Sequence, residues 1–245
     1  MPECTRRQVL ARASVAAAAA LVGPGKTQDT KGISLPKRAF GALERELPVL
    51  GLGCFPLGGL KEDADGIQVV KSAFEGGARY FDTAPSYHAG RSERLVGLGL
   101  KEAPREQVWI ATKTLARDGD AALAELEQSL ERLGMDYVDS LQIHELRSKE
   151  DVEGLFRPGG VVEALEDARE RGKLRHLGVT GHRDPGFLVQ ALEAYPFVSA
   201  LAPVNPLDCH HLSFTRGLLP AAKKKGVAVV AMKVYAGGSS PRVKE

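Results

Sequence analysis

The sequence has few cysteines, no excess of charge of one sign and no long apolar run. Its three cysteines, Cys4, Cys54 and Cys209, form no CxxC spacing and no paired framework, so a structural disulfide is not expected. The 33 basic and 31 acidic residues are interspersed and leave a formal net charge of +2, which gives no reason to expect a nucleic acid or a membrane surface as a partner. No apolar stretch reaches the roughly 20 residues of a membrane span, so none is expected in the mature chain.

The first 33 residues differ in composition from the rest of the chain. A basic segment with Arg6 and Arg7 precedes an alanine-rich apolar stretch over 11–22, and residues 23–33 form a linker without periodicity. This order is typical of a signal peptide, and the arginine pair resembles a twin-arginine export signal. We therefore expect residues 1–33 to be a signal-like segment and linker of a protein exported to the periplasm. The alternative is an alanine-rich N-terminal helix on a cytoplasmic protein.

Apolar runs alternate with amphipathic segments from residue 34 to residue 245, a length that suits one α/β barrel domain. The apolar runs, which we expect to be strands, are Val49–Phe55, Arg79–Asp82, Val108–Thr112, Tyr137–Ile143, Leu174–Thr180, Val198–Val204 and Val227–Met232. The helices expected between them are Ile67–Phe74, Ala121–Leu133, Val161–Arg171, Phe187–Tyr195 and Thr215–Lys225. Apolar strands, each followed by a helix, predict a parallel sheet that is buried on both faces.

The missing dinucleotide fingerprint decides between two parallel architectures. A doubly wound sheet carries three glycines that open a helix, but here Gly51-Leu52-Gly53 lies inside a strand and no third glycine follows. The repeats therefore favour a (β/α)8 TIM-type barrel, with a small hairpin over Lys37–Pro48 at its floor. Because seven strands are expected before Glu245, the eighth strand and the C-terminal helices are expected to be absent. An open barrel edge of this kind predicts self-association.

Four ionisable residues fall at or just beyond the ends of predicted strands. Asp82 ends the second strand, Tyr87 follows it, Lys113 ends the third strand and His144 ends the fourth. The catalytic groups of α/β barrels lie at the carboxyl ends of the strands. The four side chains are therefore expected to meet on one face, with apolar strand bodies beneath them.

These four side chains suit the reduction of a carbonyl group. A tyrosine, whose unperturbed pKa is about 10, is a poor acid near neutral pH unless a nearby cation stabilises its phenolate. Lys113 could supply that cation while Asp82 holds it by an ion pair, and His144 could donate a hydrogen bond to the carbonyl oxygen. Tyr87 would protonate that oxygen as hydride arrives from a bound cofactor, because no side chain delivers hydride.

The segments around these residues resemble the aldo-keto reductase family. The matching segments are Tyr80–Tyr87, Ser92-Glu93, Val96-Gly97, Ile110–Lys113, Tyr137–His144 and Leu174–Thr180. The resemblance implies a TIM-type barrel that reduces a small aldehyde or ketone with NADP(H) rather than NAD(H). It makes Tyr87 the general acid, Lys113 and Asp82 the groups that tune it, and His144 the group that orients the carbonyl. The Met-Lys-Val at 232–234, before a glycine-rich loop, is similar to a divergent bacterial branch that is often exported.

The same resemblance implies a set of residues that contact the cofactor. They are Gly53, Cys54 and Phe55 after the first strand, Asp82, Thr180 and Gly181 after the fifth strand, and Met232, Lys233 and Val234 at the end of the seventh. The family places a Ser-Asn pair where this chain has Thr180 and Gly181. It places a glutamine at Leu201 and an aromatic residue at Met232, so several side-chain contacts to the nicotinamide are expected to be lost. Lys233 would meet the charge of the phosphates.

Two other functions fit parts of the sequence. A catalytically inactive truncated barrel, or a non-enzymatic binding relative, fits the missing eighth strand and the altered nicotinamide contacts. A barrel hydrolase or lyase that uses Asp82 and Lys113 leaves Tyr87 and His144 without a purpose. No metal site is expected, because adjacent ligands such as those over 208–211 cannot easily converge on one ion. His88 and His182 are interpreted as ordinary polar loop residues.

Overall fold

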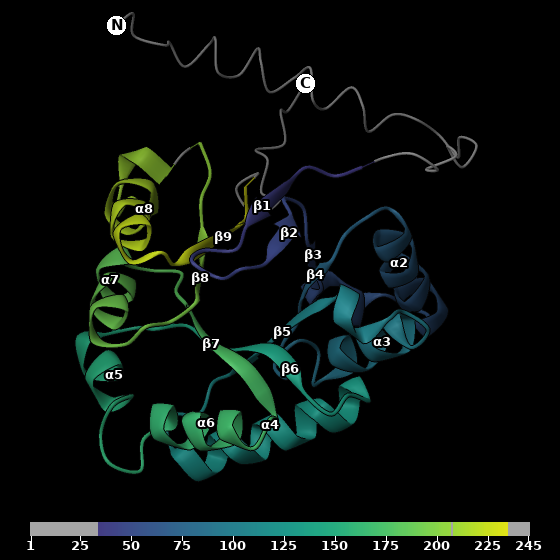
Figure 1. Cartoon of the computed structure of the whole chain (residues 1–245), viewed down its shortest axis with the longest axis horizontal. Helices are drawn as coiled ribbons and strands as arrows, with labels where there is room; N and C mark the ends of the chain where they lie inside the picture. The colour runs from purple at the N-terminus through teal and green to yellow at the C-terminus, as the bar shows by residue number, and fades with distance from the viewer. Residues whose placement is uncertain (1–33, 207, 235–245) are drawn as a thin grey trace, which may run out of the picture. The chain divides into compact units, whose positions relative to one another are not determined.

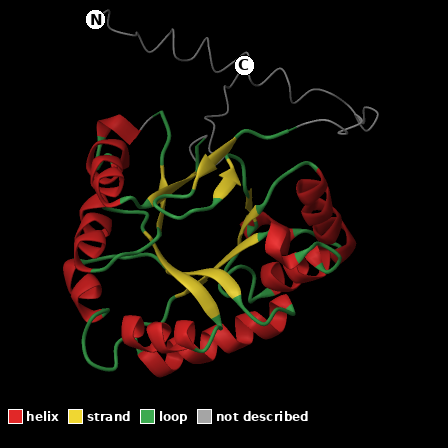
Figure 2. Cartoon of the chain, in the orientation of Figure 1, coloured by secondary structure: helices red, strands yellow, loops and turns green. Residues whose placement is uncertain are grey.

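Seven parallel strands form one sheet in the computed structural model, which describes residues 34–206 and 208–234. They are β3 (Leu52–Gly53), β4 (Tyr80–Asp82), β5 (Trp109–Thr114), β6 (Val138–Ile143), β7 (Leu174–Thr180), β8 (Ser199–Pro203) and β9 (Ala228–Met232). Each pairs with its neighbours in sequence order. Figures 1 and 2 show the strands around a central axis with the helices outside them. The predicted (β/α)8 TIM-type fold is confirmed, and the expected signal-like segment lies outside the described residues.

The helices cover the outer face of this sheet. They are α2 (Asp63–Glu75), α3 (Arg91–Leu100), α4 (Gly119–Leu133), α5 (Lys149–Gly154), α6 (Val161–Glu170), α7 (Pro185–Ala194) and α8 (Phe214–Lys225). Local sequence sets their ends: the Asp118 carboxylate accepts a hydrogen bond from the N–H of Ala121 before α4, and Gly134 and Gly226 end α4 and α8 in the left-handed conformation. Within the described ranges, no helix is long and apolar enough to cross a membrane.

The helices named from the sequence pattern do not include α3, which contains two inner glycines, Gly97 and Gly99. The structure explains both glycines by close packing. A side-chain carbon at Gly97 would lie 2.2 Å from the backbone oxygen of Leu133, and one at Gly99 would lie 2.6 Å from the side chain of Val70. The glycines therefore let α3 approach α4 and α2, and the low helix propensity of glycine is the cost of that approach.

Strand β3 is shorter than the predicted run over 49–55. It pairs with β4 through Leu52 and Gly53, and the chain then turns into a 3-10 helix, η2 (Phe55–Gly59). Val49 and Leu50 lie outside the strand and are exposed. The apolar run predicts one buried strand, but its first residues connect the hairpin at the barrel floor to the sheet.

The predicted hairpin is confirmed as the antiparallel pair β1 (Lys37–Ala39) and β2 (Glu46–Pro48). The ring of Phe40, just after β1, lies 4.6 Å from that of Trp109 and 5.9 Å from that of Tyr80. Trp109 and Tyr80 begin β5 and β4, so the hairpin covers the amino-terminal end of the barrel. The apolar cluster at this end is small, whereas the main hydrophobic core lies between the sheet and the helices.

The expectation of apolar strand bodies beneath the site holds only in part, because polar side chains share the barrel interior with apolar ones. The Gln142 side-chain amide donates to the Tyr80 hydroxyl at 3.0 Å across the barrel, and both side chains are buried. The hydroxyls of Ser140 and Ser199 are also buried and converge on Gly178, where a side-chain carbon would lie 2.7 Å from the Ser199 oxygen. The interior of the barrel is therefore mixed: it holds these polar side chains together with apolar ones such as Trp109 and Ala111.

Candidate active site

The carboxyl ends of β4, β5 and β6 bring the four predicted catalytic residues together. The ammonium group of Lys113 donates to the Asp82 carboxylate at 2.6 Å and to the backbone oxygen of Thr83 at 2.6 Å. The same nitrogen lies 4.6 Å from the centre of the Tyr87 ring. The rings of Tyr87 and His144 have centroids 6.1 Å apart. A small group held between Tyr87 and His144 would therefore meet both polar side chains.

Lys113 and Asp82 form a buried ion pair beneath Tyr87. The Lys113 side chain is fully buried and that of Asp82 is 11% exposed. Burial lowers the pKa of Lys113, but the attraction of Asp82 and Tyr87 outweighs it, so the pKa stands above its ordinary value. Lys113 is therefore a cation at neutral pH, and its ion pair with Asp82 holds it in place.

Tyr87 keeps its proton in this environment. Burial raises the pKa of Tyr87, and the charge of Lys113 only partly opposes that rise. The sequence predicts that Lys113 stabilises a phenolate at Tyr87, whereas in this structure burial has the larger effect on the pKa. The site thus presents a neutral phenol, the form that donates a proton. Phe55 packs edge-on against the Tyr87 ring at 5.2 Å and stays 57% exposed, which gives the site an apolar wall.

His144 is a neutral hydrogen-bonding group. Burial, with a further contribution from the charge of Lys113, lowers the pKa of His144 to about 3. The neutral imidazole carries one N–H, and its Nδ1 has no hydrogen-bond partner among the described residues. His144 can therefore donate to a carbonyl oxygen near neutral pH without taking up a proton itself.

The residues implied for the cofactor lie at the same end of the barrel but differ in what they can offer. Gly53 is exposed, and a side-chain carbon there would meet no other atom within 4 Å, so a ligand can approach its backbone. Cys54 is fully buried beneath it, and its N–H donates to the backbone oxygen of Asp82. Cys54 thus supports the site from below and does not present its side chain at the surface.

The residues that stand where the nicotinamide contacts are expected already make hydrogen bonds or close packing contacts within the protein. The Thr180 hydroxyl accepts a hydrogen bond from the N–H of Glu145 at 2.8 Å. The N–H of Gly181 donates to the backbone oxygen of Leu201, and a side-chain carbon at Gly181 would lie 3.0 Å from the Leu188 side chain. Residue 181 therefore has little room for an asparagine side chain. Leu201 is buried and has no polar group that could take the place of the expected glutamine.

Lys233 and His182 meet across the end of β8. Lys233, which follows Met232 at the end of β9, is exposed and has a left-handed backbone with φ of +53°. Its ammonium lies 3.1 Å from His182 Nδ1. An ammonium has no acceptor, so His182 accepts with Nδ1 and carries its hydrogen on Nε2. Val234 is exposed beside this pair.

Glu145, which no sequence motif indicates, lies beside His144 and His182. Ligand atoms of His144, Glu145 and His182 lie within 4.8 Å of one another, a set that could bind a metal ion. However, His182 Nε2 faces the Glu145 carboxylate at 3.9 Å, and the contact with Lys233 places the hydrogen on that nitrogen. A nitrogen that carries a hydrogen has no lone pair for a metal, so we interpret the three residues as a polar cluster beside the site. Asp208, considered with its neighbours as a metal ligand, instead accepts backbone hydrogen bonds from Phe214 and Thr215 at the start of α8.

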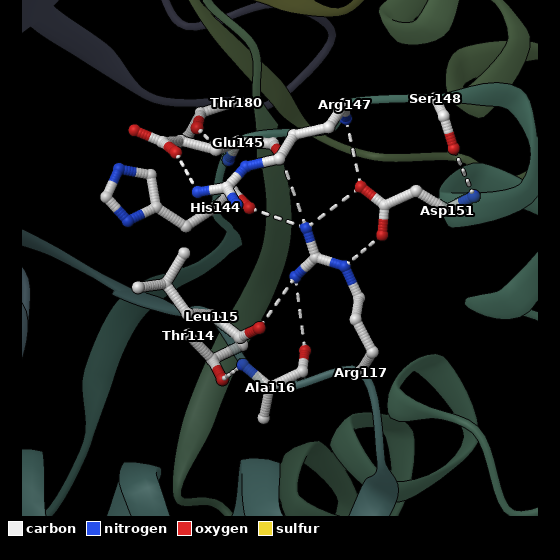
Figure 3. Close-up of polar contacts among 10 residues, drawn as sticks. All are labelled: Thr114, Leu115, Ala116, Arg117, His144, Glu145, Arg147, Ser148, Asp151 and Thr180. Atoms are coloured by element: carbon white, nitrogen blue, oxygen red, sulfur yellow. Dashed lines mark hydrogen bonds and ion pairs between the residues drawn. The ribbon is translucent and has the colours of Figure 1, made fainter.

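Arg117 is a second residue near the site that the sequence did not indicate. It follows β5 and donates to the backbone oxygen of His144 at 2.7 Å, and its guanidinium pairs with Asp151 (Figure 3). Both contacts join segments about 30 residues apart in the chain, and no local motif marks such a contact.

Comparisons with known proteins identify the family of the chain. Residues 49–244 match the family model described as the aldo/keto reductase family. The chain is 32% identical to L-galactose dehydrogenase of Arabidopsis thaliana, over 82% of this chain and 66% of the relative, and 32% identical to glyoxal reductase of Bacillus subtilis, over 76% and 63%. It therefore spans about two thirds of the length of these relatives or less. An aldo-keto reductase of Bacillus halodurans in its holo form superposes with a TM-score of 0.72 at 25% identity, over 84% of this chain and 68% of that one. The chain belongs to the aldo/keto reductase family.

Proposed function

We propose that the protein reduces an aldehyde or ketone by hydride transfer from NADP(H). The observation that carries the proposal is the placement of a neutral phenol, Tyr87, over the buried Lys113–Asp82 ion pair and opposite a neutral imidazole, His144. Aldo-keto reductases are oxidoreductases that use a nicotinamide cofactor and act on carbonyls, which supports the reaction class. The choice of NADP(H) over NAD(H) rests on the resemblance and on the exposed cation of Lys233.

The side chains divide the work of carbonyl reduction among them. A bound nicotinamide cofactor supplies the hydride. His144 donates its N–H to the carbonyl oxygen and fixes the direction of the carbonyl. Tyr87 releases its hydroxyl proton to that oxygen, and the cation of Lys113 stabilises the phenolate that remains. Asp82 holds Lys113 in place, so that the cation faces the phenol throughout the reaction.

The residues present fit a nicotinamide cofactor by access and charge. Gly53 lets a ligand approach the backbone beside Asp82, and Met232 with Lys233 would hold the opposite side. Lys233 has no carboxylate partner among residues 34–206 and 208–234, so its charge is available to a phosphate group. Gly181 and Leu201 offer the nicotinamide amide no side-chain hydrogen bond, and we expect a weaker hold on that end.

Cofactor binding and Tyr87→Phe together test the proposal. Titration with NADPH and NADH, followed by nucleotide fluorescence, should give saturable binding that is tighter for NADPH. Glyoxal is a suitable probe aldehyde, since one relative is named glyoxal reductase. Tyr87→Phe should lower kcat for its reduction by roughly 100- to 10,000-fold, because the proton donor is lost, and leave the affinity for NADPH unchanged. No saturable binding up to millimolar nucleotide would favour an inactive barrel, and unchanged turnover in Tyr87→Phe would refute the mechanism.

The cellular location of the protein and its self-association are proposed from the sequence alone. We propose that the signal-like residues 1–33 direct export through the twin-arginine route, which a reporter fused after residue 33 would test by its arrival in the periplasm. Replacing Arg6 and Arg7 by lysine should abolish that arrival. Self-association through the edges formed by β3 and β9 also stays a prediction, and light scattering on the purified chain would decide it.

A further inference from the structure

Arg117 connects the two loops that follow the strands of Lys113 and His144. One guanidinium nitrogen, Nη1, donates to the backbone oxygens of Leu115 and Ala116 at 3.1 and 3.2 Å, within its own loop. The other, Nη2, donates to the backbone oxygen of His144 at 2.7 Å and reaches that of Glu145 at 3.4 Å. Figure 3 shows the guanidinium between these carbonyl groups. A single planar group therefore sets the spacing of the two loops.

Asp151 holds the guanidinium in this position. Its carboxylate accepts from Arg117 Nε at 2.5 Å and from Nη2 at 3.2 Å, which is the two-bond arrangement that an arginine and a carboxylate favour. Asp151 lies in the first turn of α5, where Ser148 accepts from its N–H, and it also accepts from the N–H of Arg147 at 2.9 Å. The Arg117 and Asp151 side chains are 26% and 16% exposed. The pair is thus fixed on both sides and partly shielded from water.

The backbone that Arg117 holds is in an unfavourable conformation. Glu145 has φ of +55°, a left-handed value that a non-glycine residue rarely adopts without support from its surroundings. Its N–H donates to the Thr180 hydroxyl, and its carbonyl and that of His144 turn away from the sheet toward Arg117. His144 comes directly before this turn. Any relaxation of Glu145 would therefore rotate the peptide that carries the His144 side chain.

We infer that Arg117, anchored by Asp151, is a positioning residue that fixes His144 relative to Lys113 and Tyr87. The inference rests on the proposed function, because it is carbonyl reduction that needs His144 and Tyr87 on the same oxygen. Arg117 touches neither of these side chains; it holds His144 through its backbone, and besides burial its charge also contributes to lowering the pKa of His144. Since a misplacement of about 1 Å can cost a reaction roughly 100-fold, Arg117→Ala should lower kcat for glyoxal by about 10- to 100-fold. The affinity for NADPH should change much less than kcat, because Arg117 contacts none of the residues implied for the cofactor and reaches Thr180 only through Glu145.

Conservative and matched variants separate positioning from loss of structure. Arg117→Lys keeps the charge but cannot bridge four carbonyl oxygens and a carboxylate, so kcat should fall to an intermediate value. Asp151→Asn should have a similar effect, and the double variant Arg117→Ala/Asp151→Asn should be no worse than Arg117→Ala alone. Arg169→Ala is the control, because it removes an Arg–Glu pair of 2.5 Å on the outer helix α6. It should leave kcat unchanged. Guanidinium ions at millimolar concentration should restore part of the kcat of Arg117→Ala.

A spectroscopic readout keeps this inference distinct from the proposed function. In the full chain labelled with ¹⁵N-histidine, the His144 ring signals are assigned by their loss in His144→Gln. Arg117→Ala should shift or broaden these signals while those of His176, stacked on Trp109 at the barrel floor, stay in place. Unchanged His144 signals, or unchanged kcat in an active wild-type enzyme, would overturn the inference. If the wild-type chain reduces no carbonyl, the proposed function fails, and the ring signals alone decide the role of Arg117. If Arg117→Ala does not fold, Arg117→Lys gives the same decision.

Discussion

Replacing Lys113 by methionine tests the buried ion pair on which the whole site depends. The change removes a fully buried cation and leaves the Asp82 carboxylate, 11% exposed, without its partner at 2.6 Å. Removing one member of a buried pair costs about 3–5 kcal/mol, because the other charge stays buried and uncompensated. Lys113→Met should therefore lower the free energy of unfolding by about that amount at pH 8. Asp82→Asn/Lys113→Met, which buries no charge, should recover a large part of the loss.

The size of this loss should depend on pH in a defined direction. In Lys113→Met, burial raises the pKa of Asp82 and no cation opposes the rise. A carboxyl group whose pKa is higher in the folded chain than in the unfolded chain loses stability as pH rises through the folded pKa. The variant should thus be closest to wild type at pH 4, where the raised pKa keeps Asp82 largely protonated, and furthest from it at pH 8. In wild type the pKa of Lys113 is raised, so the pair should persist until the pH exceeds the ordinary lysine value of about 10.

The single tryptophan makes this measurement direct. Trp109 is 1% exposed and begins β5, the strand that carries Lys113, so its fluorescence reports unfolding of the same element. Urea unfolding at pH 4, 6 and 8 gives the free energies to compare. Lys149→Met serves as the control, because Lys149 pairs with Glu153 on the exposed surface and its loss should have no measurable effect. A loss that is the same at all three pH values, or a double variant no more stable than Lys113→Met, would refute the argument.

Two further predictions concern the neighbours of the ion pair. Because the pKa of His144 is about 3, wild-type kcat/KM for glyoxal should show no histidine titration between pH 5 and 8; an inflection near pH 6.5 that disappears in His144→Asn would contradict the assignment of a neutral imidazole. Gly181→Asn would supply the missing amide contact but press on Leu188, so this variant should be less stable than wild type. The double variant Gly181→Asn/Leu188→Ala should make room for the asparagine and bind NADPH more tightly. Equal NADPH affinity in this variant and in Leu188→Ala alone would count against a contact between residue 181 and the nicotinamide amide.

The catalytic face could be predicted from sequence because a simple geometric rule links it to the strands. In a parallel barrel every strand ends on the same side, so Asp82, Lys113 and His144 had to converge once their runs were identified as strands. Tyr87 followed from its place in the loop after Asp82. The structure confirms the strands and places the four side chains together. Their roles in a reaction stay predictions.

The sequence contains a signal for the polar side chains inside the barrel, an alternation of polar and apolar residues. Ser140, Gln142 and His144 alternate with Leu141 and Ile143, which is the period of two that separates the faces of a strand. The expectation of apolar strands that are buried on both faces does not use this alternation. In the structure Leu141 and Ile143 belong to the core between the sheet and the helices, whereas Ser140 and Gln142 lie on the opposite face of the strand, inside the barrel.

Arg117 and Glu145 could not have been found in this way. Arg117 stands in a loop among residues of ordinary loop composition, and its function depends on a partner 34 positions away. The left-handed backbone of Glu145 has no glycine to mark it. Contacts between loops depend on how the strands are spaced in three dimensions, and hydrophobic periodicity carries no information about that spacing.

The raised pKa of Tyr87 has a consequence for the direction of the reaction. Under the proposed function, the step that gives a proton to a carbonyl oxygen is the reverse of the step that takes one from an alcohol. A phenol that holds its proton near neutral pH is ready for the first step and unready for the second. The catalyst therefore works more readily as a reductase at neutral pH and gains the base for alcohol oxidation only as the medium becomes alkaline. Burial of one hydroxyl group, set by the packing around Tyr87, would thus move the rise in the rate of alcohol oxidation to higher pH, whereas the equilibrium between alcohol and carbonyl depends on the reactants and the pH alone.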